Sequence, residues 1–160
     1  MLNIRVGFGF DVHQLEEGRD LWLGGIKLPA TKGAVGHSDA DVLIHAICDA
    51  LLGAANLRDI GFHFSNKDDR WKGMDSKFFL KETTRLLLEK GWKVGNVDCT
   101  IVLEHPKVNP HIDAMKNVLA PLMNVSEDDV SIKATTNETI GYVGRLEGIN
   151  ASAVALIYRS

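Results

Sequence analysis

The amino-acid sequence predicts an α+β fold, in which a mixed four-stranded sheet carries helices on one face and an N-terminal hairpin. The length of 160 residues is the usual size of one domain. Hydrophobic residues make up 45% and charged residues 24% of the chain, the balance of an ordinary globular protein. The predicted elements follow one another in an order typical of helices packed on one face of a mixed sheet. We therefore expect residues 1–160 to form a single domain.

The N-terminal segment predicts the hairpin. Apolar residues alternate over residues 4–10 and again over residues 21–28, as they do in half-buried strands. The turn-prone stretch Glu-Gly-Arg-Asp at residues 17–20 lies between them. The two strands are expected to pair with each other across this turn.

The first helix is the most clearly marked element of the chain. Ser38 is a favourable N-cap, and Asp41 follows three residues later, close to the pattern of a capping box. Apolar residues then continue over residues 42–57. The pattern predicts a helix that Ser38 opens, followed by a polar connection over residues 58–73.

Capping residues and apolar runs predict the remaining elements. Asp75 and Ser76 precede a second helix that Gly91 ends, and Asn109-Pro110 starts a third. We expect helices over residues 77–90 and 109–123 and strands over residues 94–104, 130–135 and 151–158.

The last strand predicts an interface, because neither of its faces is strongly polar. One face comprises Ala151, Ala153, Ala155 and Ile157, and the other comprises Val154, Leu156 and Tyr158. A strand with two apolar faces is typically buried on both sides. Helices on one face of the sheet leave the other face open, so we expect another copy of the chain to cover it.

Charge and cysteine content exclude several classes of protein. The formal net charge of −3 leaves no excess of Lys and Arg to neutralise nucleic-acid phosphates. No apolar run approaches the roughly 18 residues of a membrane span, and the N-terminus lacks the pattern of a signal peptide. Cys48 and Cys99 have the spacing of neither a zinc knuckle nor a redox pair. We expect a cytoplasmic protein that binds neither nucleic acid nor membranes.

Asp11 and His13 form the first candidate for a metal site. They follow the first predicted strand, and side chains two residues apart on extended backbone point to one side. Carboxylate and imidazole are good ligands for a divalent cation such as Zn²⁺. The alternative is that both side chains only make local hydrogen bonds at the end of a strand.

The first helix offers a third candidate ligand. Asp41, His45 and Asp49 recur every four residues and form one polar stripe on a largely apolar helix. A solvated helix face is the ordinary interpretation of such a stripe, but unpaired polar groups are costly in a packed core. His45 is therefore a candidate ligand beside Asp11 and His13, with a fourth position left open. Asp49 is a candidate to orient an imidazole by hydrogen bonding.

His37 and Ser38 lie where an anion would be favoured. The N-terminus of a helix presents free amides and the positive end of its dipole, which suits a phosphate. His37 would donate a hydrogen bond to the same anion. The structural alternative for Ser38 is a simple N-cap.

The common nucleotide-binding motifs are absent. Gly7 and Gly9 begin like a dinucleotide-binding fingerprint, but Val12 stands at the third glycine position and no P-loop occurs. The segment 133–138, Lys-Ala-Thr-Thr-Asn-Glu, runs from a strand into a loop. It is either an ordinary strand end or a site whose Thr groups hold a phosphate while Glu138 holds a hard cation such as Mg²⁺.

Five motifs occur together along essentially the whole chain. They are Gly9-Phe10-Asp11-Val12-His13, Gly36-His37-Ser38-Asp39-Ala40-Asp41, Asp59-Ile60-Gly61, Lys133-Ala134-Thr135-Thr136 and Gly144-Arg145-Leu146-Glu147-Gly148. In this combination the sequence resembles the 2-C-methyl-D-erythritol 2,4-cyclodiphosphate synthase family. The resemblance implies a homotrimer of α+β subunits with active sites between neighbouring chains.

The resemblance also implies an activity. Members of the family are phosphorus–oxygen lyases of non-mevalonate isoprenoid biosynthesis. They convert 4-diphosphocytidyl-2-C-methyl-D-erythritol 2-phosphate, a small cytidine diphosphate substrate, into the cyclic diphosphate and CMP. By this resemblance, Asp11, His13 and His45 bind a zinc-like ion and Glu138 binds Mg²⁺ or Mn²⁺. His37 and Thr136 are expected to be catalytic and to stabilise the transition state.

The substrate contacts carried over by resemblance form a larger set. Asp59 and the Ile60-Gly61 backbone would hold the methylerythritol hydroxyls, and the stretch 103–109 with Thr135 would form the cytidine pocket. The expected substrate-binding residues are Asp11, His13, His37, Ser38, Asp59, Ile60, Gly61, Phe64, Asp68, Leu103, Pro106, Lys107, Val108, Asn109, Thr135, Thr136, Glu138, Tyr142 and Arg145. The chain departs from the family pattern within residues 64–68 and at Leu103 and Glu104.

Two other functions are compatible with parts of this pattern. A metal-dependent phosphohydrolase would use the same ligands to direct water at the diphosphate. A trimeric nucleotide-binding regulatory module would have no turnover and would lack the metal ligands. The nucleophile of the cyclase reaction is the substrate's own 2-phosphate, which is already anionic, so the absence of a convincing catalytic triad agrees with the cyclase.

Overall fold

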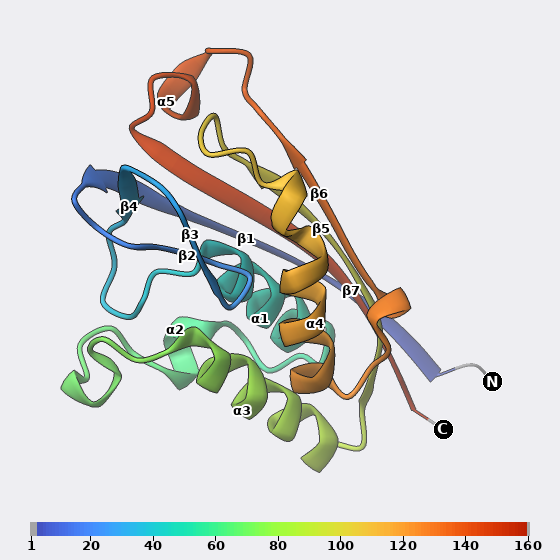
Figure 1. Cartoon of the computed structure of the whole chain (residues 1–160). Coiled ribbons are helices and arrows are strands. Elements are labelled where there is room, and N and C mark those ends of the chain that lie inside the picture. Colours follow the sequence, from blue (N-terminus) through green and yellow to red (C-terminus); the bar gives the residue numbers. More distant parts are fainter. Residues whose placement is uncertain (1–2, 160) are drawn as a thin grey trace.

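A mixed five-stranded sheet runs through the computed structural model, which describes residues 3–159 (Figure 1). The strand order is β4-β1-β7-β5-β6. Among the strands of residues 3–159 in this sheet, only β5 and β6 pair in parallel. The strands are β1 (Asn3–Glu17), β4 (Lys32–Ala34), β5 (Lys93–Val102), β6 (Val130–Thr135) and β7 (Gly148–Arg159). The predicted α+β class with a mixed sheet is confirmed, and the short β4 adds a fifth strand to the four that were expected.

The N-terminal hairpin was wrongly predicted. Strand β1 continues to Glu17 and pairs with β4 and β7 rather than with residues 21–28. Residues 21–28 form a separate two-stranded sheet of β2 (Leu21–Leu23) and β3 (Ile26–Leu28). The turn between them consists of Gly24 and Gly25, whose φ angles of 62° and 80° suit glycine and close a tight hairpin.

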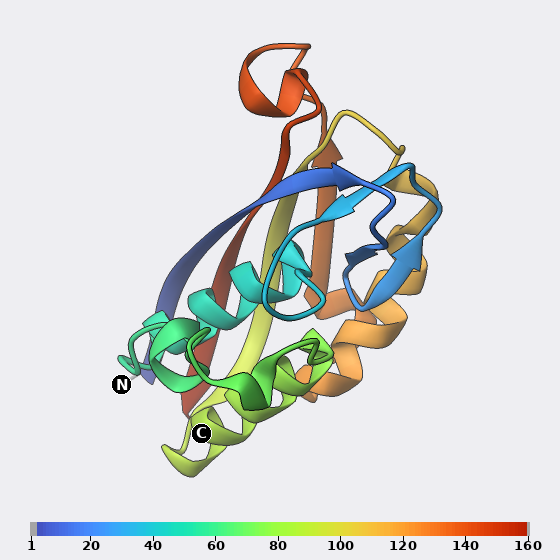
Figure 2. The same ribbon diagram turned by 90° about the vertical axis from the view of Figure 1, so that its left-hand side faces the viewer.

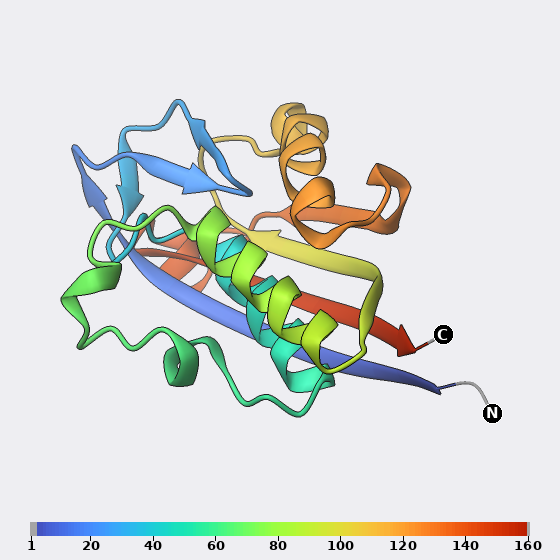
Figure 3. The same ribbon diagram turned by 90° about the horizontal axis from the view of Figure 1, so that it is seen from below.

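The helices lie on one side of the sheet, as predicted (Figures 2 and 3). Helix α1 packs directly against β1 and β7, and α3 covers α1 on the side away from the sheet. The α-helices are α1 (Val42–Ala54), α2 (Ile60–His63), α3 (Ser76–Glu89), α4 (Ile112–Met123) and α5 (Gly141–Gly144). The short 3₁₀ helices are η1 (Asp69–Trp71), η2 (Asn109–His111) and η3 (Glu127–Asp129). No helix within residues 3–159 has both the length and the apolar character needed to cross a bilayer.

Helix α1 begins at Val42, and its N-cap is Asp41 rather than the predicted Ser38. The Asp41 carboxylate accepts the amide of Ile44 at 3.1 Å and the amides of Gly24 and Gly25 at 3.0 and 2.7 Å. These three hydrogen bonds explain why a carboxylate can be fully buried there, since buried polar groups need hydrogen bonds. Asp41 thus ties the glycine turn to the start of α1.

Gly7 and Gly9 allow β1 and α1 to approach closely. A Cβ atom on Gly7 would lie 2.0 Å from the carbonyl oxygen of Ala50, and one on Gly9 would lie 1.9 Å from that of Ala46. Any side chain would therefore push the helix off the strand. These glycines serve packing, which agrees with their rejection as a dinucleotide motif.

The sheet face that points away from the helices is apolar and uncovered in the single chain. On β7, Ala151, Ala153, Ala155 and Ile157 are buried under the helices, as one face of the strand was predicted to be. On the other side, the large apolar side chains of β1 and β7 are exposed: Ile4, Val6, Phe8, Phe10, Val12, Val154 and Tyr158. Phe8 is 65% exposed.

Candidate metal and substrate site

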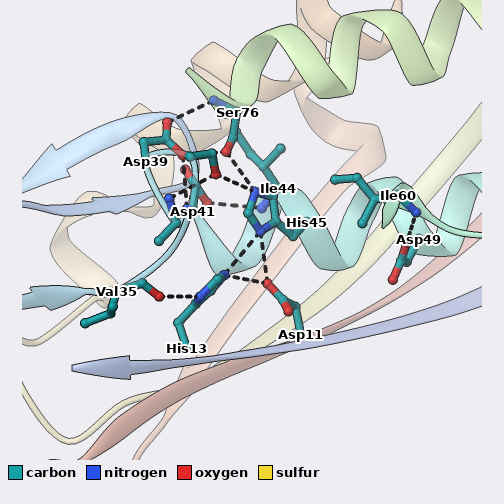
Figure 4. A network of polar contacts seen from close by, with 12 residues as sticks. Asp11, His13, Val35, Asp39, Asp41, Ile44, His45, Asp49, Ile60 and Ser76 are labelled. Atoms are coloured by element: carbon teal, nitrogen blue, oxygen red, sulfur yellow. Dashed lines mark hydrogen bonds and ion pairs between the residues drawn. The ribbon is translucent and has the colours of Figure 1, made fainter. Parts of the chain in front are cut away.

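The strand and the helix that pack through the glycines bring three predicted ligands together. Asp11 and His13 alternate with exposed residues on β1 and point toward the helix face. His45 lies one turn into α1 and points back toward them (Figure 4). Within residues 3–159, these three residues are the group of His, Cys, Asp and Glu whose ligand atoms all lie within 4.8 Å of one another.

The ligand atoms form a small triangle. Asp11 Oδ2 lies 3.0 Å from His13 Nε2 and 3.1 Å from His45 Nδ1. The two histidine nitrogens are 3.2 Å apart. Ligand bonds of about 2.0–2.1 Å in a tetrahedral zinc site give ligand–ligand distances of about 3.3 Å. The three atoms therefore already have nearly the spacing that a tetrahedral ion requires, with a fourth position left for another ligand.

The hydrogen bonds and charges of the site prepare these atoms to bind a cation. His13 Nδ1–H donates to the carbonyl of Val35 at 2.8 Å, which leaves the Nε2 lone pair facing the other ligands. Burial raises the pKa of Asp11, but the contacts of its carboxylate with the imidazoles of His13 and His45 outweigh burial and lower that pKa to about 2. Burial lowers the pKa of His13, but Asp11 outweighs it and raises that pKa. Asp11 is thus ionised, as a carboxylate that binds a cation must be.

Asp49 does not orient a ligand, so this prediction was wrong. Its carboxylate accepts the amide of Ile60 at 2.7 Å and fixes the start of α2 (Figure 4). His45 Nε2 instead contacts Ser76 Oγ at 2.9 Å and Ser38 Oγ at 3.3 Å. Ser76 lies on α3, far from His45 in the sequence, so helical spacing could not identify it.

A cavity of about 380 Å³ adjoins the metal ligands. Its lining combines metal ligands, predicted substrate contacts and aromatic side chains: His13, Gly36, His37, Ser38, His45, Ile60, Gly61, Phe64, Asn66, Trp71 and Phe79. Trp71 is a lining residue that the sequence did not suggest. Its ring meets Phe64 edge-on with centroids 5.5 Å apart, so together they form an apolar wall.

Asp59 and Asp68 lie beside this cavity without lining it. Asp59 is exposed and caps α2 by accepting the amide of Phe62 at 3.0 Å. Asp68 pairs with Arg70, which lowers the pKa of Asp68, and its carbonyl accepts the Nε2–H of His37 at 3.2 Å. Both residues thus shape the loops around the cavity, and their substrate contacts stay predictions.

A second pocket, of about 180 Å³, gathers the residues predicted for the cytidine group. It lies where β5 and β6 end and is lined by Leu103, Pro106, Lys107, Val108, Asn109, Ala134, Thr135 and Thr136. It shares no lining residue with the cavity beside the metal ligands. In a single chain, the two halves of the predicted site are therefore separate.

The loop after β6 carries Glu138, whose carboxylate is exposed and accepts the hydroxyl of Thr136 at 3.3 Å. Glu138 belongs to no cluster of ligand atoms within the part of the chain that is described. Glu104, which is buried, accepts the amides of Asn137 and Thr139 at 2.9 and 3.2 Å and so fixes this loop. The sequence pattern did not suggest that role.

Tyr142 and Arg145 lie in and just after α5. The Tyr142 hydroxyl accepts an N–H of the Asn150 side chain at 2.7 Å. Arg145 pairs with Glu147 at 3.0 Å on the surface. Neither lines the two pockets described above, so their substrate contacts stay predictions.

Comparisons with known proteins agree with this arrangement of residues. The YgbB family model matches residues 4–158. A 2-C-methyl-D-erythritol 2,4-cyclodiphosphate synthase from Cytophaga hutchinsonii is 65% identical over 158 residues, which cover 99% of each chain. Among solved structures, a CDP-bound form of a synthase of the same name has a TM-score of 0.88 and 39% identity, with 96% of this chain and 99% of that chain covered.

In a second solved structure, only part of the protein corresponds to the present chain. The bifunctional IspDF protein from Campylobacter jejuni has a TM-score of 0.96 and 35% identity over the whole of this chain. The present chain spans 43% of that protein. With the family model covering nearly every residue and a relative 65% identical along its full length, the chain belongs to the YgbB family.

Proposed function

We infer that this chain is a lyase that converts 4-diphosphocytidyl-2-C-methyl-D-erythritol 2-phosphate into 2-C-methyl-D-erythritol 2,4-cyclodiphosphate and CMP. The observation that carries this inference is the convergence of Asp11, His13 and His45 beside a cavity lined by predicted substrate contacts. The names of the relatives support it at 65% identity and full coverage. The reaction is a step in the non-mevalonate route to isoprenoid precursors.

Two divalent cations are part of the proposal. Zn²⁺ would be held by Asp11, His13 and His45, whose spacing suits a tetrahedral ion and whose ligand types suit zinc. Mg²⁺ or Mn²⁺ would be held by Glu138, an exposed carboxylate that leaves room for substrate oxygens as further ligands. When bound, these cations supply Lewis acidity and offset the negative charge of the phosphates.

The residues of the chain would mainly position the substrate. The 2-phosphate oxygen attacks the β-phosphorus, the bond to the CMP oxygen breaks, and CMP leaves with that electron pair. His37 and Thr136 would donate hydrogen bonds to phosphoryl oxygens as charge develops on them. The amides of Ile60 and Gly61 and the Asp59 carboxylate would hold the methylerythritol hydroxyls, and the pocket containing Lys107 and Thr135 would hold the cytidine.

A homotrimer with shared active sites is also proposed, and the sheet register supports it. Thr135 pairs with Val102, Val102 with Asn150, and Asn150 with Val12. Thr135 and Val12 are therefore three strand spacings, or about 14 Å, apart. The side chains of these four paired residues point away from the helices, whereas the next residue after Val12, His13, points toward them. A neighbouring copy against the open face would bring the cytidine pocket of one chain to the metal ligands of another.

We also propose that the enzyme acts in the cytoplasm on a small-molecule substrate, without nucleic acid or membrane partners. Cys48 and Cys99 are both free and buried, as expected of a protein in a reducing compartment.

Product identification tests the proposed reaction. The purified chain, with Zn²⁺ and Mg²⁺, should convert the substrate to CMP and a cyclic diphosphate, which ³¹P nuclear magnetic resonance distinguishes from open-chain phosphates. Open-chain phosphates as the only products would favour the hydrolase. Binding of cytidine nucleotide without any turnover would favour the regulatory module.

A further inference from the structure

His45 has a second hydrogen-bond partner that the proposed reaction does not by itself explain. Its Nε2 lies 2.9 Å from Ser76 Oγ, on the first turn of α3. Ser76 is fully buried, and its hydroxyl donates to Oδ1 of Asp39. The contacts run from the metal-facing Nδ1 through the imidazole and the hydroxyl to a carboxylate (Figure 4).

The positions of the protons in the hydrogen bonds from His45 to Ser76 and from Ser76 to Asp39 follow by elimination. An ionised carboxylate only accepts hydrogen bonds, so the single proton of the Ser76 hydroxyl is used on Asp39. The Ser76 oxygen then offers only lone pairs to His45, so Nε2 must carry a proton. In a neutral imidazole Nδ1 is consequently bare, and Nδ1 is the atom that lies 3.1 Å from Asp11 Oδ2.

Asp39 is itself held by the backbone on both sides. Its Oδ2 accepts the amide of Ser76 at 2.9 Å, and its Oδ1 accepts the amide of Asp41 at 3.1 Å. Its own amide donates to the carbonyl of Met74 at 3.1 Å. The carboxylate cannot turn away without losing these bonds, so it fixes the direction of the Ser76 hydroxyl.

We propose that Ser76, oriented by Asp39, is a positioning residue for the metal ligand His45. It holds the imidazole in the tautomer and the rotation that present Nδ1 to the cation, an inference that rests on the metal site of the proposed function. Ser38 Oγ is farther from Nε2, at 3.3 Å, and accepts the amide of Ala40. Partners that orient a metal-binding histidine typically change metal affinity or activity by about 10–100-fold when they are removed.

The test uses a pair of variants on α3. Ser76→Ala removes the hydroxyl but keeps the backbone amide that Asp39 binds. Thr84→Val is the control, because Thr84 is also buried on α3, and its hydroxyl donates to the carbonyl of Leu80 rather than to the site. Zinc dissociation constants are measured by competition with a chromophoric chelator, and the Tm of each metal-free protein is measured alongside.

Ser76→Ala should weaken zinc binding by about 10–100-fold, while Thr84→Val should bind zinc like the native chain. Unchanged zinc affinity in Ser76→Ala would overturn the proposal, even if its metal-free Tm falls, because the hydroxyl would then be merely structural. Equal weakening in both variants would overturn it too. A native chain that binds no zinc would contradict the proposed metal site as well as this inference.

A readout on the native chain is independent of how any variant folds. Long-range ¹H–¹⁵N correlation spectra of the zinc-loaded protein should show His45 with metal on Nδ1 and a proton on Nε2. Metal on Nε2 would overturn the assignment.

Discussion

At the scale of single residues, the metal site depends on side chains whose spare hydrogen-bonding groups are already occupied. His13 uses Nδ1 on a backbone carbonyl and His45 uses Nε2 on Ser76, so each has one nitrogen left for a ligand. Asp11 and His13 could be predicted because strand alternation places them on one side. Ser76 and Glu104 could not, because their partners are distant in sequence and neither belongs to a periodic pattern.

His45→Ala should empty the zinc site. Only two ligands would remain, and two side chains rarely hold zinc against water. Metal analysis of the purified, dialysed variant should find far less than one zinc per chain, while the native chain retains it. Undiminished stoichiometric zinc in the variant would contradict the ligand assignment.

Glu138→Gln should leave zinc bound and raise the Mg²⁺ or Mn²⁺ concentration needed for activity. The amide has the shape of the carboxylate but lacks its charge, which a hard cation prefers. Activity measured against Mg²⁺ concentration at constant zinc checks this. A Mg²⁺ dependence identical to that of the native chain would mean that Glu138 is not the ligand.

At the scale of elements, the position of the site depends on the contact between β1 and α1. The helices and long strands were predictable from apolar periodicity and caps. The segment 21–28 was not, because its apolar pattern spans a Gly24-Gly25 turn that divides it into two strands. The start of α1 was misplaced because two acceptable caps, Ser38 and Asp41, occur in succession, and the tertiary bonds of Asp41 to the glycine turn favour the second.

Gly9→Ala should strongly destabilise the chain. The new methyl group would lie 1.9 Å from the backbone oxygen of Ala46, and neither backbone can move without separating α1 from β1. The expected loss of unfolding free energy is about 3 kcal/mol, the upper end for overpacking. Urea denaturation measures it.

Gly53→Ala is the matched control for this variant. Gly53 lies in α1, and a Cβ there meets nothing within 4 Å, so alanine should stabilise the helix by about 0.5–1 kcal/mol. If Gly9→Ala unfolds at the same urea concentration as the native chain, close packing at Gly9 is not what places the helix.

At the scale of the whole molecule, the open apolar face and the two separate pockets both point to assembly. The chain should have the mass of three chains by light scattering at micromolar concentration. Phe8→Glu, on the open face of β1, should reduce it to one chain, because a buried charge opposes association. The dissociated protein should still bind zinc but lack activity.

Leu88→Glu controls for the added charge. Leu88 is also a large exposed apolar residue, but it lies on α3 on the opposite side of the sheet. This variant should stay trimeric and active. A native chain with the mass of one subunit and full activity would refute the shared active site.

The proposed reaction requires that the substrate's own 2-phosphate, rather than water, displaces CMP. Holding that phosphate beside the diphosphate can supply an effective molarity on the order of 10⁵ M or more. A water molecule is not tethered to the substrate and gains no such advantage. The most direct test incubates the enzyme and both metals with an analogue that lacks only the 2-phosphate, and follows CMP by chromatography. The analogue should bind through its cytidine and release CMP negligibly. Release at a rate comparable to that of the true substrate would show that water is the nucleophile and that the chain is a hydrolase.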